Sequence, residues 1–221
     1  MRSGIGVVFL LCWLSPFLVW AEPVEINKKG CRGCHRFSSA DKEAKEGPDL
    51  FYAGDKFLKS WLENFLQSPV VVRQVIYVPD PNYPGGKPEK NQPHVVLIKD
   101  ESERISDFLT TLRLPGLMGK IDEKPLSKSE LAQAKILFER KYGCISCHEA
   151  LNLVGKIRGG VSGPTLVNSA LRLNPDWIFH WLKTPEKFLS KGRMPRYDLN
   201  DATAIHITKY VLSIRTKSLK N

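Results

Sequence analysis

The sequence has few residues that bind metals through sulfur or nitrogen. Its 221 residues include five cysteines, five histidines and three methionines. Cys12 lies in an apolar N-terminal stretch, and the other cysteines all belong to two copies of the pattern Cys-x-x-Cys-His: Cys31, Cys34, Cys144 and Cys147. Beyond the N-terminal stretch there is no spare thiol, which excludes sites that use a cysteine outside these motifs as a ligand.

The N-terminal apolar run is too short for a typical membrane span. It reads "GIGVVFLLCWLSPFLVW", residues 4–20, after Arg2 and before Ala21. A cation, a short apolar core and a small final residue are the parts of a secretory signal, whereas a span needs about 20 apolar residues. We expect residues 1–21 to be a signal peptide, which places the protein in the periplasm with no transmembrane segment after cleavage. An uncleaved N-terminal membrane anchor is the alternative.

Acidic residues are fewer than basic ones. Lysine and arginine number 33 against 23 acidic residues, a net charge of +10 that becomes +9 when Arg2 is lost with the signal. Such a surplus favours acidic partners or an anionic surface. Nucleic acid is excluded as a partner, because the basic residues are scattered among acidic ones and an exported chain rarely meets nucleic acid.

The doubled Cys-x-x-Cys-His pattern has three interpretations. One zinc ion shared by both pairs would need them about 15–20 residues apart, but 109 residues (35–143) separate Cys34 from Cys144. A thioredoxin-type pair would need a βαβ pattern, and neither copy has one. In the third interpretation, two thiols form thioethers with the vinyl groups of one haem and the next histidine binds the iron. We therefore expect two haem c groups, with His35 and His148 as proximal iron ligands.

With these motifs the chain resembles the dihaem class I cytochromes c over essentially all of residues 22–221. The resemblance implies a mostly α fold of two tandem cytochrome c-like domains, 22–119 and 120–221, each enclosing one covalent haem. The segments "GPDL" and "GPTL" follow the two motifs and are similar to a family segment that packs near the proximal histidine. By this resemblance Pro48 and Pro164 pack against haem, with plain turns as the alternative.

Further features recur in both halves of the chain. "FLKSWLENFLQSP" and "WIFHWLKTP" both predict helices that stop at a proline, with Trp61-Leu62 matched to Trp181-Leu182. Residues 113–129 are rich in proline, glycine and lysine and are predicted to be the linker. Residues 70–92 depart from the family pattern, and their β-branched start predicts a short β-hairpin inserted in the first domain. Helix starts are predicted from capping residues at Asp100, Ser127 with Glu130, Asn174-Pro175 and Asn200 or Asp201.

A six-coordinate haem iron needs a second axial ligand. Met194 precedes a proline in a loop before the last helix, which resembles the distal-ligand loop of class I cytochromes c. The equivalent loop of the first half, "NQPHVVLIKD", has His94 instead of a methionine. We predict Met194 as the distal ligand of the second iron and His94 as that of the first. Three other candidates are less well placed. Met118 lies in the linker, and His180 and His206 lie inside predicted helices.

These features predict a dihaem cytochrome that carries electrons between periplasmic redox proteins of a respiratory chain. Histidine–methionine ligation gives the second haem the higher potential, so electrons enter at the first haem and rest on the second. The partners of the protein are expected to be redox proteins with acidic docking surfaces. The alternatives are a peroxidase-like or thiosulfate-oxidising dihaem enzyme and an electron-transfer subunit of a larger oxidoreductase.

Overall fold

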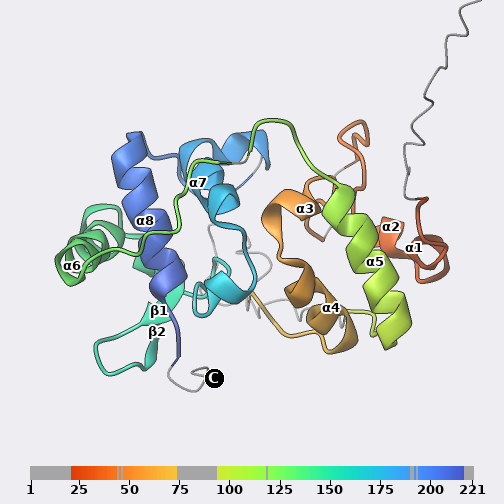
Figure 1. Cartoon of the computed structure of the whole chain (residues 1–221), viewed down its shortest axis with the longest axis horizontal. Coiled ribbons are helices and arrows are strands. Elements are labelled where there is room, and N and C mark those ends of the chain that lie inside the picture. Colours follow the sequence, from red (N-terminus) through yellow and green to blue (C-terminus); the bar gives the residue numbers. More distant parts are fainter. Residues whose placement is uncertain are drawn as a thin grey trace, which may run out of the picture.

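The computed structural model describes residues 21–43, 45, 47–73, 94–117, 119–189, 192 and 194–216. These residues are mostly helical, with one small two-stranded sheet, so the prediction of a mostly α fold is confirmed. Figure 1 shows two groups of elements side by side, α1–α5 and α6–α8, joined by the segment that leaves α5. Among the described residues, no helix combines the length and the apolar character needed to cross a membrane. Residues 1–20 of the predicted signal lie outside the described residues.

The first half of the chain, residues 22–119, is built around two helices that pack along each other. Leu62 and Leu66 of α4 and Ile105 and Leu109 of α5 are buried at helical spacing. The cap predicted at Asp100 was wrong, because α5 begins at Lys99 and its N-cap residue is Ile98. The helices of this half are α1 (Glu25–Lys28), α2 (Cys31–Cys34), α3 (Ala53–Lys56), α4 (Lys59–Gln67) and α5 (Lys99–Thr111).

The second half, residues 120–221, packs α8 against α6 and α7. Its predicted helix starts are confirmed, because Ser127 and Glu130 form a reciprocal capping box and the Asn200 side chain accepts a hydrogen bond from the Thr203 N–H at 2.9 Å. Its helices are α6 (Lys128–Ile136), the π-helical turn η1 (Leu137–Lys141), the 3-10 turns η2 (Cys144–Ser146), η3 (Ser169–Leu171) and η4 (Pro185–Lys187), α7 (Pro175–Lys183) and α8 (Asp201–Ser213).

The sheet is a hairpin of β1 (Glu149–Leu151) and β2 (Ile157–Gly159), paired antiparallel. It follows directly on the second Cys-x-x-Cys-His motif, where no strand was expected. The hairpin predicted in the first half falls mainly on residues 74–92, which lie outside the described residues; residues 70–73 form no strand.

The bounds of α4 and α7 correct the sequence match between the halves. Both helices have nine residues and are followed, after one residue, by a proline, so their third residues, Trp61 and Trp177, correspond. The seventh residues, Phe65 and Trp181, correspond in the same way. The match of Trp61-Leu62 to Trp181-Leu182 was therefore wrong by one helical turn. The pair in α4 that corresponds to Trp181-Leu182 is Phe65-Leu66, which is also an aromatic residue followed by leucine.

The two halves meet through the short segments that precede α4 and α7. The Leu58 N–H donates to the Arg172 carbonyl at 2.9 Å, and the Asn174 N–H donates to the Lys56 carbonyl at 3.0 Å. Asn174 is the N-cap residue of α7, as predicted, but its side-chain amide donates to the other half, to the Asp55 carbonyl at 2.9 Å. Tyr52 stacks on Trp177 across the same boundary, with ring centroids 4.8 Å apart.

The linker is held by a carboxylate from each half. Asp55 in α3 accepts a hydrogen bond from the Leu114 N–H at 2.6 Å. Asp176 in α7 accepts from three successive N–H groups at 2.8 Å, those of residues 119, 120 and 121. Buried acceptors that satisfy several backbone donors fix a segment in place, so this part of the linker has one defined path.

Candidate functional site

Each Cys-x-x-Cys-His motif begins with one tight helical turn. The preceding glycines, Gly30 and Gly143, have φ of 69° and 63°, which bends the chain sharply into the turn. Residues three apart lie on one face of such a turn, so both cysteines of a motif face the same way. In each motif the histidine N–H donates to the carbonyl of the first cysteine, at 3.0 Å for His35 and 3.1 Å for His148.

No disulfide joins the four motif cysteines. The first cysteine of each motif is partly buried, and burial raises the pKa of Cys31 and raises that of Cys144 to about 11. Cys34 and Cys147 are exposed, so one edge of each motif faces solvent.

The two motif histidines have the same backbone partner in both halves. His35 Nδ1 lies 2.7 Å from the Pro48 carbonyl, and His148 Nδ1 lies 2.8 Å from the Pro164 carbonyl. A carbonyl only accepts, so Nδ1 carries the proton and Nε2 keeps its lone pair. Burial lowers the pKa of both rings, which keeps them neutral. This is the arrangement of a histidine whose Nε2 binds a metal.

Glycine before each proline makes this hydrogen bond feasible. A Cβ at Gly47 or Gly163 would lie 2.5 Å from the Cε1 atom of the corresponding histidine, closer than Cβ atoms approach other groups. The Gly-Pro pair is therefore a cradle for the ring, with the glycine leaving room and the proline supplying the acceptor. Sequence analysis placed Pro48 and Pro164 near haem but did not foresee the role of their carbonyls.

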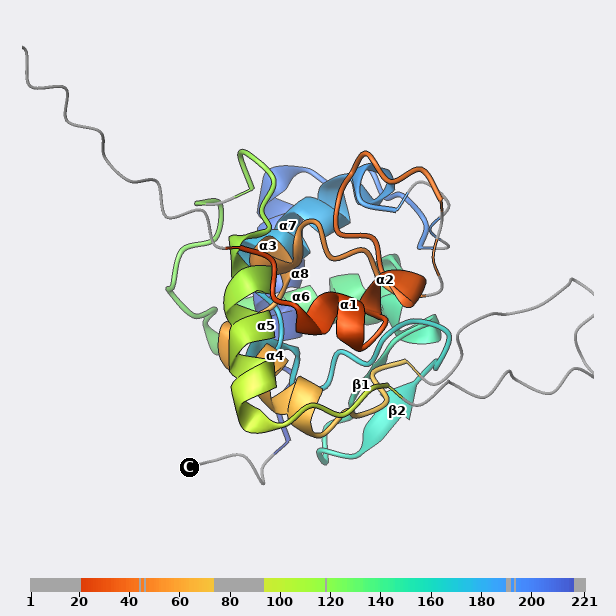
Figure 2. The same ribbon diagram turned by 90° about the vertical axis from the view of Figure 1, so that its right-hand side faces the viewer.

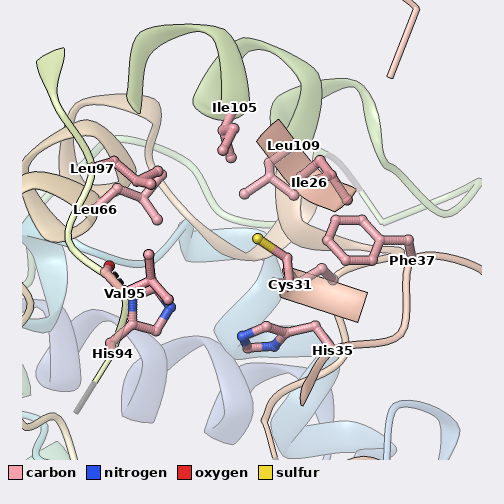
Figure 3. A pocket seen from close by; sticks show the side chains of 11 residues that line it. Ile26, Cys31, His35, Phe37, Leu66, His94, Val95, Leu97, Ile105 and Leu109 are labelled. Carbon is pink, nitrogen blue, oxygen red and sulfur yellow. Dashed lines mark hydrogen bonds between the residues drawn. The ribbon is translucent and has the colours of Figure 1, made fainter. Parts of the chain in front are cut away.

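His94 faces His35 across a small apolar pocket, which Figure 3 shows from close by. Their ring centroids are 6.2 Å apart, and His94 Nδ1 donates to the Val95 carbonyl at 2.8 Å, so in the neutral ring Nε2 keeps its lone pair. Two histidines on opposite sides of one metal ion, with metal–nitrogen bonds of about 2.0–2.1 Å, place their centroids roughly 6.3–6.5 Å apart. The spacing of these rings would therefore allow both to bind one metal ion. Aliphatic side chains line the pocket: Ile26, Leu66, Leu97, Ile105 and Leu109.

Met194 takes the place in the second half that His94 takes in the first. The Met194 sulfur accepts a hydrogen bond from Trp181 Nε1 at 2.9 Å, and the His94 ring meets Phe65 edge-on with centroids 5.1 Å apart. Because Phe65 and Trp181 are equivalent residues of α4 and α7, both distal candidates lie against the same helix position. No hydrogen bond joins Met194 to His148 in the described residues.

The remaining candidates lie elsewhere. His180 is in α7, with Nε2 buried and without a partner among the described residues, and burial lowers its pKa. His206 is half-buried in α8, and Met118 lies outside the described residues. The described part of the chain has no cluster of three or more histidine, cysteine or acidic side chains that could hold a metal ion without a cofactor.

A cation lies near each motif histidine, the half-buried Lys56 near His35 and the buried Arg172 near His148. The Lys56 ammonium lies over the rings of Phe57 and Trp177, 4.9 and 5.4 Å from their centroids, with no hydrogen bond or ion pair in the described residues. Burial, and secondarily the nearby Arg172, lower the pKa of Lys56 to about 8. Arg172 is 6% exposed, burial lowers its pKa to about 10, and its Nε has no partner in the described residues. Buried cations without an anion are costly, so this region is suited to bind one.

Sequence analysis missed these two cations, although a signal for them exists. Each stands eight residues after the proline of its Gly-Pro pair, Lys56 after Pro48 and Arg172 after Pro164.

Comparison of the chain with protein-family models, curated proteins and solved structures gave no match.

Proposed function

We propose that this protein is an exported dihaem c-type cytochrome that transfers electrons between periplasmic redox proteins, with tandem cytochrome c-like domains in its two halves. The main support is the repeated geometry of the motif histidines. In both halves a Cys-x-x-Cys-His turn is followed by a Gly-Pro pair that fixes Nδ1 and leaves Nε2 free to bind iron. One such arrangement could serve packing alone, but two at matching positions indicate a shared purpose.

The chain offers a suitable group for each part of haem c. Cys31, Cys34, Cys144 and Cys147 would form the thioethers, and His35 and His148 would bind the irons. Haem carries carboxylates on its propionate groups. Lys56 and Arg172 have no ion pair in the described residues, and the Arg172 Nε also lacks a hydrogen-bond partner there, so both cations are suited to hold these carboxylates. When bound, each haem supplies an iron that gains and loses one electron while its protein ligands stay in place.

The placement of His94 favours an electron carrier over an enzyme. Catalysis at haem iron needs an open coordination position, and His94, close to His35, would occupy that position on a haem bound by His35. The His94 ring is held by the hydrogen bond to the Val95 carbonyl and by its contact with Phe65. With His94 as the second ligand the first iron would have no open position, which supports electron transfer over catalysis.

The two sites are expected to differ in potential. Histidine–histidine ligation at the first iron gives a lower potential than histidine–methionine ligation at the second, since neutral sulfur favours ferrous iron. Each difference of about 59 mV gives a tenfold preference for one electron. Electrons would enter at the first site, cross the boundary where Lys56 and Arg172 lie, and rest at the second.

Spectroscopy of the purified, exported protein tests this proposal. We expect two covalent haems per chain, two low-spin ferric signals at low temperature, and two waves in a redox titration. A chain with one haem or none would contradict the proposal of a dihaem cytochrome. A high-spin first haem that binds carbon monoxide rapidly would instead support the enzyme alternative.

A further inference from the structure

The hairpin of the second half ends in a rigid turn. The Asn152 N–H donates to the Lys156 carbonyl at 2.9 Å, and the Asn152 side-chain oxygen accepts from the N–H groups of Val154 and Lys156 at 3.0 and 2.9 Å. Gly155 completes the turn with a φ of 77°, a conformation that suits glycine. The turn is therefore fixed before anything binds to it.

The tip of this turn carries aliphatic side chains in full contact with solvent. Leu153 is 92% exposed, Val154 is 72% exposed and Ile157, at the start of β2, is 58% exposed. Tight turns normally carry polar residues, glycine or proline, and the exposed part of an aliphatic side chain does not stabilise the fold. These three residues, which we call the hairpin tip, thus present more apolar surface to solvent than a turn needs.

Basic side chains surround the hairpin tip. Lys156 lies within the turn, and Leu153 shares a surface hollow with Lys135 and Arg215. Figure 1 shows the hairpin at the outer edge of the second half, beside the end of α8. Of the nearby acidic residues, Glu139 is already paired with Lys135 and Arg158. The surroundings of the tip therefore favour an anionic partner.

We propose that the hairpin tip inserts into the headgroup region of an anionic lipid bilayer. The tip is convex, and a protein partner would need a pocket shaped to receive it, whereas a bilayer accepts any apolar projection of this size. Cations beside an inserted apolar group bind anionic headgroups and strengthen the attachment. This surface attachment needs no membrane-spanning helix, and it is independent of the haem chemistry proposed above.

The attachment would place the second Cys-x-x-Cys-His motif next to the membrane. Strand β1 begins with Glu149, directly after His148, and the Gly160 N–H donates to the Ile145 carbonyl at 2.9 Å. Gly159 and Gly160 pack so closely on the motif that a Cβ on either would collide with its backbone. The hairpin is thus joined firmly to the motif, and the position of its tip determines how far that site lies from the bilayer.

Sedimentation with lipid vesicles tests this inference on the exported, haem-loaded protein. The vesicles contain phosphatidylcholine alone or equal parts of phosphatidylcholine and phosphatidylglycerol. We expect binding to the anionic vesicles that weakens as salt is raised, and a loss of about 30-fold or more in partitioning for the double variant Leu153→Ser/Val154→Ser. The matched control is Val24→Ser/Ile98→Ser, which replaces side chains 59% and 68% exposed in the first half, and it should stay within about twofold of the wild type.

Three outcomes would overturn the inference. The first is no binding of the wild type to anionic vesicles, and the second is equal binding to both vesicle types. The third is unchanged vesicle binding of Leu153→Ser/Val154→Ser, which would mean that another part of the chain makes the contact with lipid. Circular dichroism and the haem spectrum of each variant verify that the fold is intact, so a loss of binding can be assigned to the tip.

Discussion

Replacing Gly163 with alanine should displace the ring of His148. The new Cβ would lie 2.5 Å from Cε1 and 2.6 Å from Nδ1 of that ring, whereas ordinary contact begins at 3.4 Å. The ring would have to retreat by about 0.9 Å. The hydrogen bond from Nδ1 to the Pro164 carbonyl is now 2.8 Å long, so the same movement would break it.

The loss of folding stability in Gly163→Ala follows from these two effects. Overpacking of a tight site costs about 1–3 kcal/mol, and a lost hydrogen bond costs about 1 kcal/mol. The sum of roughly 2–4 kcal/mol corresponds to a fall in Tm of about 4–16 °C for a protein of this size. Thermal unfolding followed by circular dichroism measures this fall. The imidazole also loses the partner that orients it as a ligand, so the redox titration wave of the second haem should shift.

Gly33 provides the matched control. It lies within the first motif, has no positive φ, and a Cβ built on it would meet nothing within 4 Å. The second motif has Ser146 at this position, so a side chain is tolerated there. Gly33→Ala should leave Tm and both redox waves nearly unchanged. If Gly163→Ala were as stable as Gly33→Ala and kept both waves, the cradle argument would be refuted.

Three further predictions concern ligation, the linker and pH. His94→Ala should open the first iron of the haem-loaded protein to carbon monoxide, which absorption spectroscopy detects. The control His206→Ala, in α8, should not bind carbon monoxide. Equal binding by both variants would rule out His94 as a ligand. Asp176→Ala leaves three linker N–H groups without their acceptor and should lower the free energy of unfolding in urea by about 2–4 kcal/mol. Asp122→Ala removes an exposed carboxylate that accepts from one N–H, that of Lys124, and pairs with Lys209, so it should lower this free energy by less. Although burial acts to raise it, hydrogen bonds from Lys135 and Arg158 hold the pKa of Glu139 below its usual 4.5. The stability this gives is present above pH 4.5 and is lost as pH falls through the lowered value. Glu139→Gln should therefore be less stable at neutral pH and lose less in an acid titration, and an acid titration identical to the wild type would contradict this.

Local chemistry made much of the fold predictable. The capping box of Ser127 and Glu130 involves residues three apart, so the sequence alone defines the start of α6. The same is true of the cap at Asn200 and of the turns that begin each motif. The placement of His94 ahead of the last helix of its half was also readable, because the order of features repeats along the chain.

What sequence reasoning missed depends on contacts between distant segments. The Asn174 amide looked like a helix cap, but its acceptors belong to the other half and no periodicity reveals them. Lys56 and Arg172 lie at the boundary between the halves, and their surroundings depend on contacts that the sequence does not display. The hairpin after His148 has strands of only three residues, too short for alternation of apolar and polar residues to be recognised.

The reciprocal bonds between segments 56–58 and 172–174 resemble the contact of an isologous dimer, in which one patch is used twice. In a true homodimer every substitution would appear at both sites, and the two sites would remain identical. Joining the copies in one chain removes that restriction, so that one half has histidine and the other methionine at corresponding positions. The direction of electron flow that we propose needs such inequality. On the proposed function, having two unlike halves in one chain, more than any single residue, would let an electron enter at one site and rest at the other.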